Sequence, residues 1–234
     1  MGPDVVVASG DLTQRAKRSE FEGARELVDR FGDVPVVVTP GNHDVPVYRA
    51  LERFTAPYRN WRRFSGSSEL DTVTRVPGAT FVALSSAAPY RAVVSGRLRA
   101  RQMAFAHRAF RQAPVEHHRI VVIHHHFVPV EGGGAGRPLS GAVELLKEFE
   151  AMGVSAILGG HVHQLHMHPS SSLTGSARSV PVLSTGTATS RRGRGAEAAV
   201  NSLCVLRFSD AEVEVTPYER AVGGGGFEAL ESTT

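Results

Sequence analysis

Four short polar segments carry the residues that could do chemistry, and each follows an apolar run. They are Gly-Asp ending at Asp11, Gly-Asn-His-Asp at 41–44, three histidines at 124–126 and Gly-His-Val-His at 160–163. Together they supply a carboxylate, an amide oxygen and several imidazoles. This mixed oxygen and nitrogen set suits Mn, Fe, Zn or Co better than Ca or a thiolate zinc site. Paired ions of that kind would activate a water molecule and neutralise a phosphoryl group.

Each segment by itself has a simpler interpretation. Gly-Asp after a strand is commonly a turn with a capping carboxylate, and Gly-Asn-His-Asp could be a polar turn before a helix. Three histidines at the mouth of a buried strand are a stronger signal, because imidazoles lose hydration there unless they find partners. If their segment is extended, His161 and His163 face the same side. The sequence contains no Walker loop, no G-x-S-x-G elbow and no C-x-x-C pair, so the joint pattern favours metal-assisted hydrolysis.

The elements that must position these segments alternate between strand and helix patterns. Helical spacing covers 21–31, 98–113 and 137–153, whereas 45–78 is less regular and is expected to form a short helix and loops. Apolar runs predict strands at 4–9, 34–38, 80–87, 120–123, 154–160, 180–187, 202–208 and 211–219. Strand, helix and strand with short links are typical of parallel sheets, whose loops gather at the carboxyl ends of the strands. We therefore expect the four polar segments to converge.

Composition sets broad limits on the class of protein. The 234 residues fit one domain, predicted at 1–220, followed by a flexible Gly-rich tail at 221–234. The net charge is only +3, so binding to nucleic acid is not required. Two arginine clusters are interpreted as solvated faces or, for the second, phosphate-facing loops: Arg59, Arg62 and Arg63, and Arg191, Arg192 and Arg194. Because the sequence shows no membrane-spanning run and no secretory signal, a cytoplasmic location is expected.

The ordered set of motifs resembles four of the five motifs of the calcineurin-like metallophosphoesterase superfamily. The similarity extends from about Pro3 to Glu219 and is strongest to the bacterial branch of cyclic-nucleotide and glycerophosphodiester phosphodiesterases. The resemblance implies a four-layer α/β/β/α sandwich with two mixed sheets and helices outside. It also implies a hydrolase that acts on a small-molecule phosphodiester or phosphomonoester through metal-bound hydroxide, without a covalent intermediate.

The resemblance also implies a role for each matching residue. Asp11 corresponds to the carboxylate that bridges two metals, and Asn42 and His161 to ligands of the second metal. His163 corresponds to a ligand of the first metal. His43 resembles the general acid that protonates the leaving oxygen, a role that suits imidazole near neutral pH. Asp44 is expected to orient His43.

The triple histidine allows two alignments. The family form is two histidines followed by a proline, and with Pro129 as the anchor His124 becomes the ligand of the second metal. Sliding by one residue makes His125 the ligand instead. His166 and His168 are assigned to an outgoing strand and not to the metals. Cys204 is interpreted as a core residue.

The fifth motif of the family, Asp-x-His on the first strand, has no match upstream of Asp11. The first metal would then keep only Asp11 and His163, so that two ions are expected in the full-length form and one here. Two explanations account for the missing motif. Either Met1 is internal to a longer protein whose first strand is missing here, or the chain is a shortened, inactive or single-metal interaction module. We favour the first, because the other ligand types are all retained.

Overall fold

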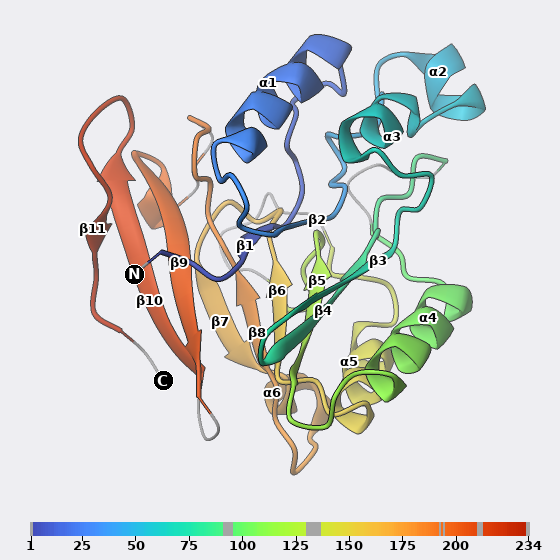
Figure 1. Cartoon of the computed structure of the whole chain (residues 1–234), viewed down its shortest axis with the longest axis vertical. Coiled ribbons are helices and arrows are strands. Elements are labelled where there is room, and N and C mark those ends of the chain that lie inside the picture. Colours follow the sequence, from blue (N-terminus) through green and yellow to red (C-terminus); the bar gives the residue numbers. More distant parts are fainter. Residues whose placement is uncertain are drawn as a thin grey trace.

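The computed structural model describes residues 2–90, 96–129, 137–191, 193, 195–209 and 213–232, and its centre is a six-stranded mixed sheet (Figure 1). The strand order is β3-β4-β5-β6-β8-β7. The four inner strands run parallel, and the two edge strands pair antiparallel with their neighbours. The bounds are β3 (Thr72–Val76), β4 (Ala79–Leu84), β5 (His118–Ile123), β6 (Ala156–Gly159), β7 (His166–Pro169) and β8 (Pro181–Ser184).

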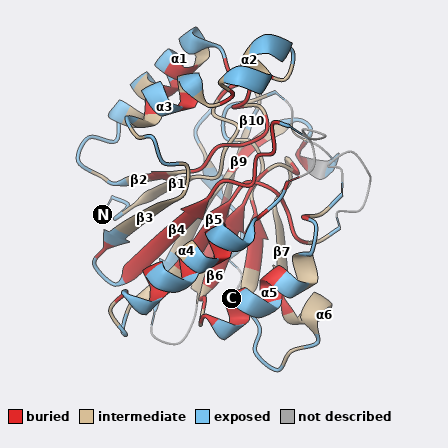
Figure 2. Ribbon diagram, turned by 90° about the vertical axis from the view of Figure 1, so that its right-hand side faces the viewer, coloured by how far each residue is buried: buried red, intermediate tan, exposed pale blue. Residues whose placement is uncertain are grey.

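Helices cover one face of this sheet. They are α4 (Ala100–Arg111), α5 (Ala142–Ala151) and the short α6 (Ser171–Thr174). The apolar stripes of α4 and α5 pack on alternate residues of β4 and β5 in one core cluster, which includes Phe110 and Phe149. Figure 2 shows these helices buried on the side toward the sheet and exposed on the other. The helical spacing read at 98–113 and 137–153 therefore gives two amphipathic helices.

The opposite face is covered by a second layer of strands that consists of two parts. One part is a parallel pair, β1 (Val6–Ala8) and β2 (Val36–Val38). The other is antiparallel, in the order β11-β10-β9, and comprises β9 (Val200–Phe208), β10 (Val213–Ala221) and β11 (Glu228–Ala229). Both parts pack on the same core cluster, since Val7 of β1 and Leu206 of β9 contact it.

The two parts of the second layer leave strand edges without a partner. Among the described residues, β1 pairs only with β2, and β9 pairs only with β10. In Figure 1, β9 is the strand of its sheet nearer to β1. The facing edges of one layer are therefore not joined by backbone hydrogen bonds.

A third group of helices lies outside the second layer. It comprises α1 (Arg18–Asp29), α2 (Ala50–Thr55) and α3 (Arg59–Ser65), and a single turn of 3-10 helix, η1 (Gly195–Glu197), lies elsewhere, before β9. Phe21 of α1 packs with Trp61 and Phe64 of α3, and Val38 of β2 contacts this cluster. The four-layer α/β sandwich is thus confirmed, with its second sheet in two parts.

Two regions differ from the prediction. The stretch 45–78 forms two helices, α2 and α3, and the edge strand β3, because Thr72–Val76 pairs with β4 across the turn at Gly78. The predicted flexible tail folds back, because Glu228 and Ala229 pair with Glu219 and Tyr218 of β10. In the described part of the chain, no helix is both long and apolar enough to cross a membrane.

Candidate metal centre

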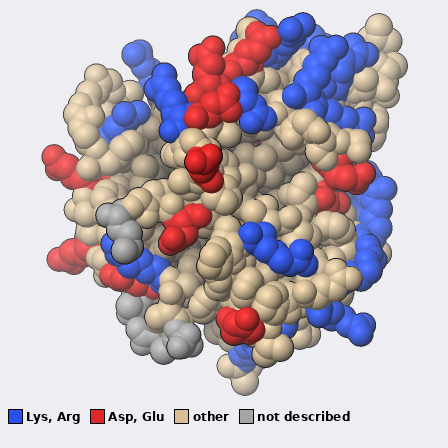
Figure 3. Space-filling model, in the orientation of Figure 1, with Lys and Arg blue, Asp and Glu red and all other residues tan. Residues whose placement is uncertain are grey.

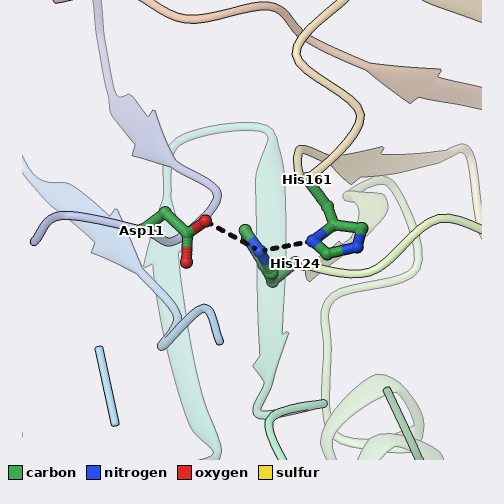
Figure 4. A group of neighbouring side chains, drawn as sticks. All are labelled: Asp11, His124 and His161. Atoms are coloured by element: carbon green, nitrogen blue, oxygen red, sulfur yellow. Dashed lines mark hydrogen bonds and ion pairs between the residues drawn. The ribbon is translucent and has the colours of Figure 1, made fainter. Parts of the chain in front are cut away.

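The four predicted polar segments follow β1, β2, β5 and β6, at the carboxyl ends of these strands. Asp11, His124 and His161 point toward one another from three of these loops (Figure 4). Each offers a ligand atom, and these atoms all lie within 4.8 Å of one another. Among the described residues, these three form the group of acidic, histidine or cysteine side chains that could hold a metal ion. The predicted ligand His163 lies outside this group.

Asn42 completes the cluster from the loop after β2. Its Oδ1 lies 2.9 Å from His161 Nδ1 and 3.1 Å from His124 Nε2. His124 Nε2 is 3.2 Å from His161 Nδ1 and 3.4 Å from Asp11 Oδ2. A cation with bonds of about 2.1 Å places neighbouring ligand atoms about 3.0–3.4 Å apart in octahedral or tetrahedral geometry. The observed spacing therefore fits a divalent ion, and the oxygen and nitrogen donors suit Mn, Fe, Zn or Co.

His124 is held in the form that a metal ligand requires. Its Nδ1 lies 2.8 Å from the carbonyl oxygen of Ser9, which can only accept, so Nδ1 donates and the lone pair stays on Nε2. Burial is the largest single influence and lowers the pKa of the His124 imidazole, but the Asp11 carboxylate, the Ser9 carbonyl and Asp44 together outweigh burial, so that this pKa is raised. Burial likewise raises the pKa of the Asp11 carboxyl, but His124 and His43 outweigh it and hold that pKa below its ordinary value.

The site residues adopt unusual backbone conformations. Four non-glycine residues of the described chain have a positive φ, and three are predicted ligands: Asp11 at 55°, His161 at 72° and His163 at 59°; the fourth is Ala16 at 53°. A left-handed residue with a Cβ costs about 1–2 kcal/mol, and such strain concentrates at functional sites. His161 and His163 therefore occupy a turn, and the extended geometry considered for them is not observed.

A close approach of two loops fixes Asp11. Gly41, the first residue of the second polar segment, lies against this carboxylate, and a Cβ at Gly41 would overlap Asp11 Oδ1. The backbone N–H of His43 also donates to Asp11 Oδ1 at 2.9 Å. Two residues of the loop after β2 therefore hold the carboxylate that the loop after β1 carries.

The structure does not show the predicted contact between Asp44 and the His43 ring. His43 Nδ1 lies 2.9 Å from the carbonyl oxygen of Gln14. Asp44 instead accepts from the backbone N–H groups of Thr13 and Gly41, both at 2.9 Å, and from the Thr13 hydroxyl. Asp44 thus joins the first two loops, and the main-chain carbonyl of Gln14 orients the imidazole.

Asp44 also carries an electrostatic cost. It is 1% exposed, and burial, followed by the neighbouring Asp11 carboxylate, raises its pKa to about 6. Its N–H and hydroxyl donors oppose this rise only in part. Because it is buried and accepts hydrogen bonds from backbone N–H groups of two loops, the Asp44 carboxylate stabilises the packing of these loops against each other.

The remaining histidines of the triple lie beside the cluster. His125 is 1% exposed, with Nδ1 2.7 Å from the hydroxyl of Ser86. Burial, followed by the charges of His124 and His161, lowers the pKa of the His125 imidazole well below its ordinary value. The ring of His126 stacks on His161 at a centroid distance of 5.5 Å. Sequence reasoning missed Ser86, since an isolated serine after a strand carries no signal of such a contact.

The sequence is similar to a known protein family and to curated proteins. A family model described as calcineurin-like phosphoesterase matches residues 1–165. Two curated relatives are each 28% identical over 69% of this chain: the 3',5'-cyclic adenosine monophosphate phosphodiesterase CpdA of Haemophilus influenzae and a probable cyclic nucleotide phosphodiesterase of Synechococcus sp.. The matched parts are 55% and 58% of those proteins, so the chain spans just over half the length of the curated relatives it matches.

Solved structures with little sequence identity share the fold. A dimetal phosphatase from Danio rerio superposes with a TM-score of 0.58 at 12% identity, over 93% of this chain and 81% of that one. GAP50, described as the anchor in the inner membrane complex of Plasmodium, gives a TM-score of 0.53 at 13% identity, over 98% and 77% of the two chains. At these identities the likeness extends to the fold alone.

Proposed function

The chain belongs to the calcineurin-like phosphoesterase family, and on that premise we propose that it hydrolyses a small-molecule phosphodiester or phosphomonoester. Activated water attacks phosphorus directly, without a covalent intermediate. Divalent ions at the site would lower the pKa of water and neutralise the phosphoryl charge when bound. The observation that carries the proposal is the convergence of Asn42, His124 and His161 on Asp11 from four separate loops.

The proposal assigns metal-binding roles to the side chains of the cluster. Asp11, Asn42, His124 and His161 hold one ion, because their donor atoms already lie at ligand spacing. Asp11 and His163 contribute to a second ion, as the family resemblance implies. We propose Mn, Fe, Zn or Co as the metal, since the donor set accepts each of them.

His43 is proposed as the general acid that protonates the leaving oxygen. Its Nδ1 is engaged by the Gln14 carbonyl, so Nε2 is the atom left to exchange a proton with the substrate. Its backbone N–H binds Asp11, which places the imidazole beside the metal ligands. General acid–base help is typically worth about 10²–10⁴-fold in rate.

Substitutions at these positions test the proposal. Asp11→Ala or Asn42→Ala should abolish metal-dependent turnover of a chromogenic phosphodiester in the full-length protein. His43→Ala should lower the rate by about 10²–10⁴-fold while the metal content stays that of the unsubstituted protein. Unchanged rates in both the Asp11 and Asn42 variants would refute the assignment.

The names of the curated relatives indicate which phosphoester to assay first. The curated relatives are named as cyclic nucleotide phosphodiesterases, which makes a cyclic nucleotide the first diester to assay.

Nucleic acid is a weaker candidate, because the exposed Arg59, Arg62 and Arg63 lie on one short helix. In Figure 3, basic side chains gather toward α2 and α3, and acidic side chains are interspersed over the rest of this face. Arg192 and Arg194 of the second cluster lie outside the described residues. A cytoplasmic location stays a prediction.

We also propose that a further strand belongs between β1 and β9 in the full-length protein. The unjoined edges of these strands and their shared core support this. The family resemblance implies that such a strand would end in Asp-x-His and complete the first metal site. The alternative is a single-metal or inactive interaction module.

The genomic reading frame upstream of Met1 separates the two. The proposal predicts an in-frame apolar strand that ends in Asp-x-His, and a stop codon directly upstream with no such strand would contradict it. Metal analysis of the full-length protein gives a second test, since two equivalents favour an enzyme and one or none favours the alternative.

A further inference from the structure

The two consecutive histidines that follow β5, His124 and His125, have different kinds of hydrogen-bond partner at Nδ1. Nδ1 of His124 faces the carbonyl oxygen of Ser9, which can only accept a hydrogen bond. Nδ1 of His125 faces the hydroxyl of Ser86 at 2.7 Å, and a hydroxyl can donate. The partner on Nδ1 decides which nitrogen of a neutral imidazole carries the proton.

The contacts of Ser86 decide its direction. The backbone N–H of His125 donates to Ser86 Oγ at 3.3 Å, so this oxygen already accepts one hydrogen bond. Ser86 is 0% exposed, so its own proton needs an acceptor within the protein. Among the described contacts of this hydroxyl, His125 Nδ1 is the acceptor that it can reach. The hydroxyl therefore donates to Nδ1, and the proton of the neutral ring lies on Nε2.

This Nε2–H group is a buried donor beside the metal ligands. The His125 side chain is 1% exposed, and Nε2 has no hydrogen-bond partner among the described residues. The ring centroid lies 4.7 Å from that of His161 and 5.0 Å from that of His124. A Cβ at Gly96 would overlap the His125 ring, so the chain there packs directly against the imidazole and restricts its movement. A fixed, unsatisfied donor at this place requires an acceptor.

We propose that His125 binds substrate as a neutral hydrogen-bond donor, through Nε2–H to a phosphoryl oxygen, and that Ser86 is the positioning residue that fixes its tautomer. The role differs from that of His124, whose Nε2 lone pair is available to a cation. Phosphoryl oxygens are strong acceptors, and a neutral donor binds them without competing for the metal. This inference rests on the proposed function, because it names a further substrate contact at the same site.

The tautomer can be measured without any turnover. Long-range ¹H–¹⁵N correlation spectra of the metal-free protein should show His124 protonated at Nδ1 and His125 protonated at Nε2. A His125 ring protonated at Nδ1 would overturn the proposal whether or not the protein hydrolyses anything. In the Ser86→Ala variant the His125 signals should shift toward a mixture of tautomers, while those of His124 stay in place.

Binding of inorganic phosphate to the metal-loaded protein provides the second test. His125→Leu removes the donor and should weaken phosphate binding by about 10- to 100-fold, the range for a hydrogen bond to a charged group. Its metal content should equal that of the unsubstituted protein. His125→Gln retains an N–H near the position of Nε2 and should recover part of the affinity.

The possible outcomes separate the competing roles of His125. Loss of metal in His125→Leu, matching the loss in His124→Ala, would make His125 a ligand and overturn the proposal. Phosphate affinity that is equal in the Leu and Gln variants and in the unsubstituted protein would make it a packing residue. If His125→Leu does not fold, the tautomer of His125 in the unsubstituted protein and in the Ser86→Ala variant still tests the proposal. Phosphate binding with no hydrolysis would refute the proposed function alone.

Discussion

The two β layers of this molecule differ in completeness. The six-stranded sheet is continuous and packed on both faces, and Ile120 and Val122 of its β5 are 0% exposed. The opposite layer is a parallel pair and an antiparallel triplet, in which the strand residues of β1 and the core-facing residues of β9 are only half-buried. The strands at the unjoined edges, β1 and β9, are therefore less buried than β5 at the centre of the continuous sheet, and their layer is the one expected to gain from further pairing.

The candidate metal centre draws on both layers. The continuous sheet supplies His124 and His161 from the loops after β5 and β6, and these converge with Asn42 and Asp11. His163 lies outside that group. The four side chains that converge therefore come from both layers, two from the loops after β1 and β2 and two from the loops after β5 and β6.

The largest effect is expected where the two layers meet at Asp11. Gly41→Ala would drive a methyl group into the Asp11 carboxylate, displace the carboxylate from His124 and reduce metal-dependent turnover by at least about 10²-fold. Gly23→Ala is the matched control, since a Cβ at Gly23 meets nothing within 4 Å. Turnover and metal content of both variants check this prediction. Full activity in Gly41→Ala would mean that the loops are not closely packed in solution.

A second comparison measures the difference in packing between the layers. Ile120→Ala, in the continuous sheet, should lower the free energy of unfolding by about 2–5 kcal/mol, because a fully buried side chain leaves a cavity. Leu206→Ala, in the half-buried β9, should cost less, about 1–2 kcal/mol. Denaturant unfolding of both variants tests the ranking. Equal losses would show that the second layer is as well packed as the first.

The pH dependence of metal binding should show the smallest effect. The pKa of His124 is raised, so the protonated pair with Asp11 stabilises the metal-free fold below about pH 6.5 and is lost as the pH rises through the folded pKa. A metal ion requires the neutral ring, so its apparent affinity should rise with pH, by up to about tenfold per unit. The metal-induced increase in Tm should therefore be larger at pH 8 than at pH 6. An increase that is independent of pH would argue against His124 as a ligand.

Much of the fold followed from local patterns. Apolar runs that end in polar turns predicted β1, β2, β5 and β6. These are the four strands whose following loops carry the site residues. The edge strand β3 was missed, since its pattern of threonine, valine and arginine gains meaning only from pairing with β4. The end of the chain was predicted to be flexible from its glycines, whereas tertiary pairing with β10 orders Glu228 and Ala229.

The site was predictable in its side chains and not in its main chain. Motif order grouped five residues as metal ligands, and the structure places the donor atoms of Asp11, Asn42, His124 and His161 close together, while His163 lies outside that group. The carbonyl oxygens of Ser9 and Gln14 orient the imidazoles of His124 and His43, respectively. A contact with a main-chain carbonyl cannot be predicted from the residue type, because every residue carries one. Asp44 was misassigned for the same reason, because its partners are backbone N–H groups of other loops.

The most direct test of the account is a calorimetric titration of the metal-free protein with Mn²⁺, carried out on the unsubstituted chain and two variants. The account predicts at least one bound equivalent, lost in His124→Ala and retained in His107→Ala, whose imidazole is exposed on α4. No bound metal in the unsubstituted chain, or equal binding by both variants, would contradict the claim that these loops form a metal centre.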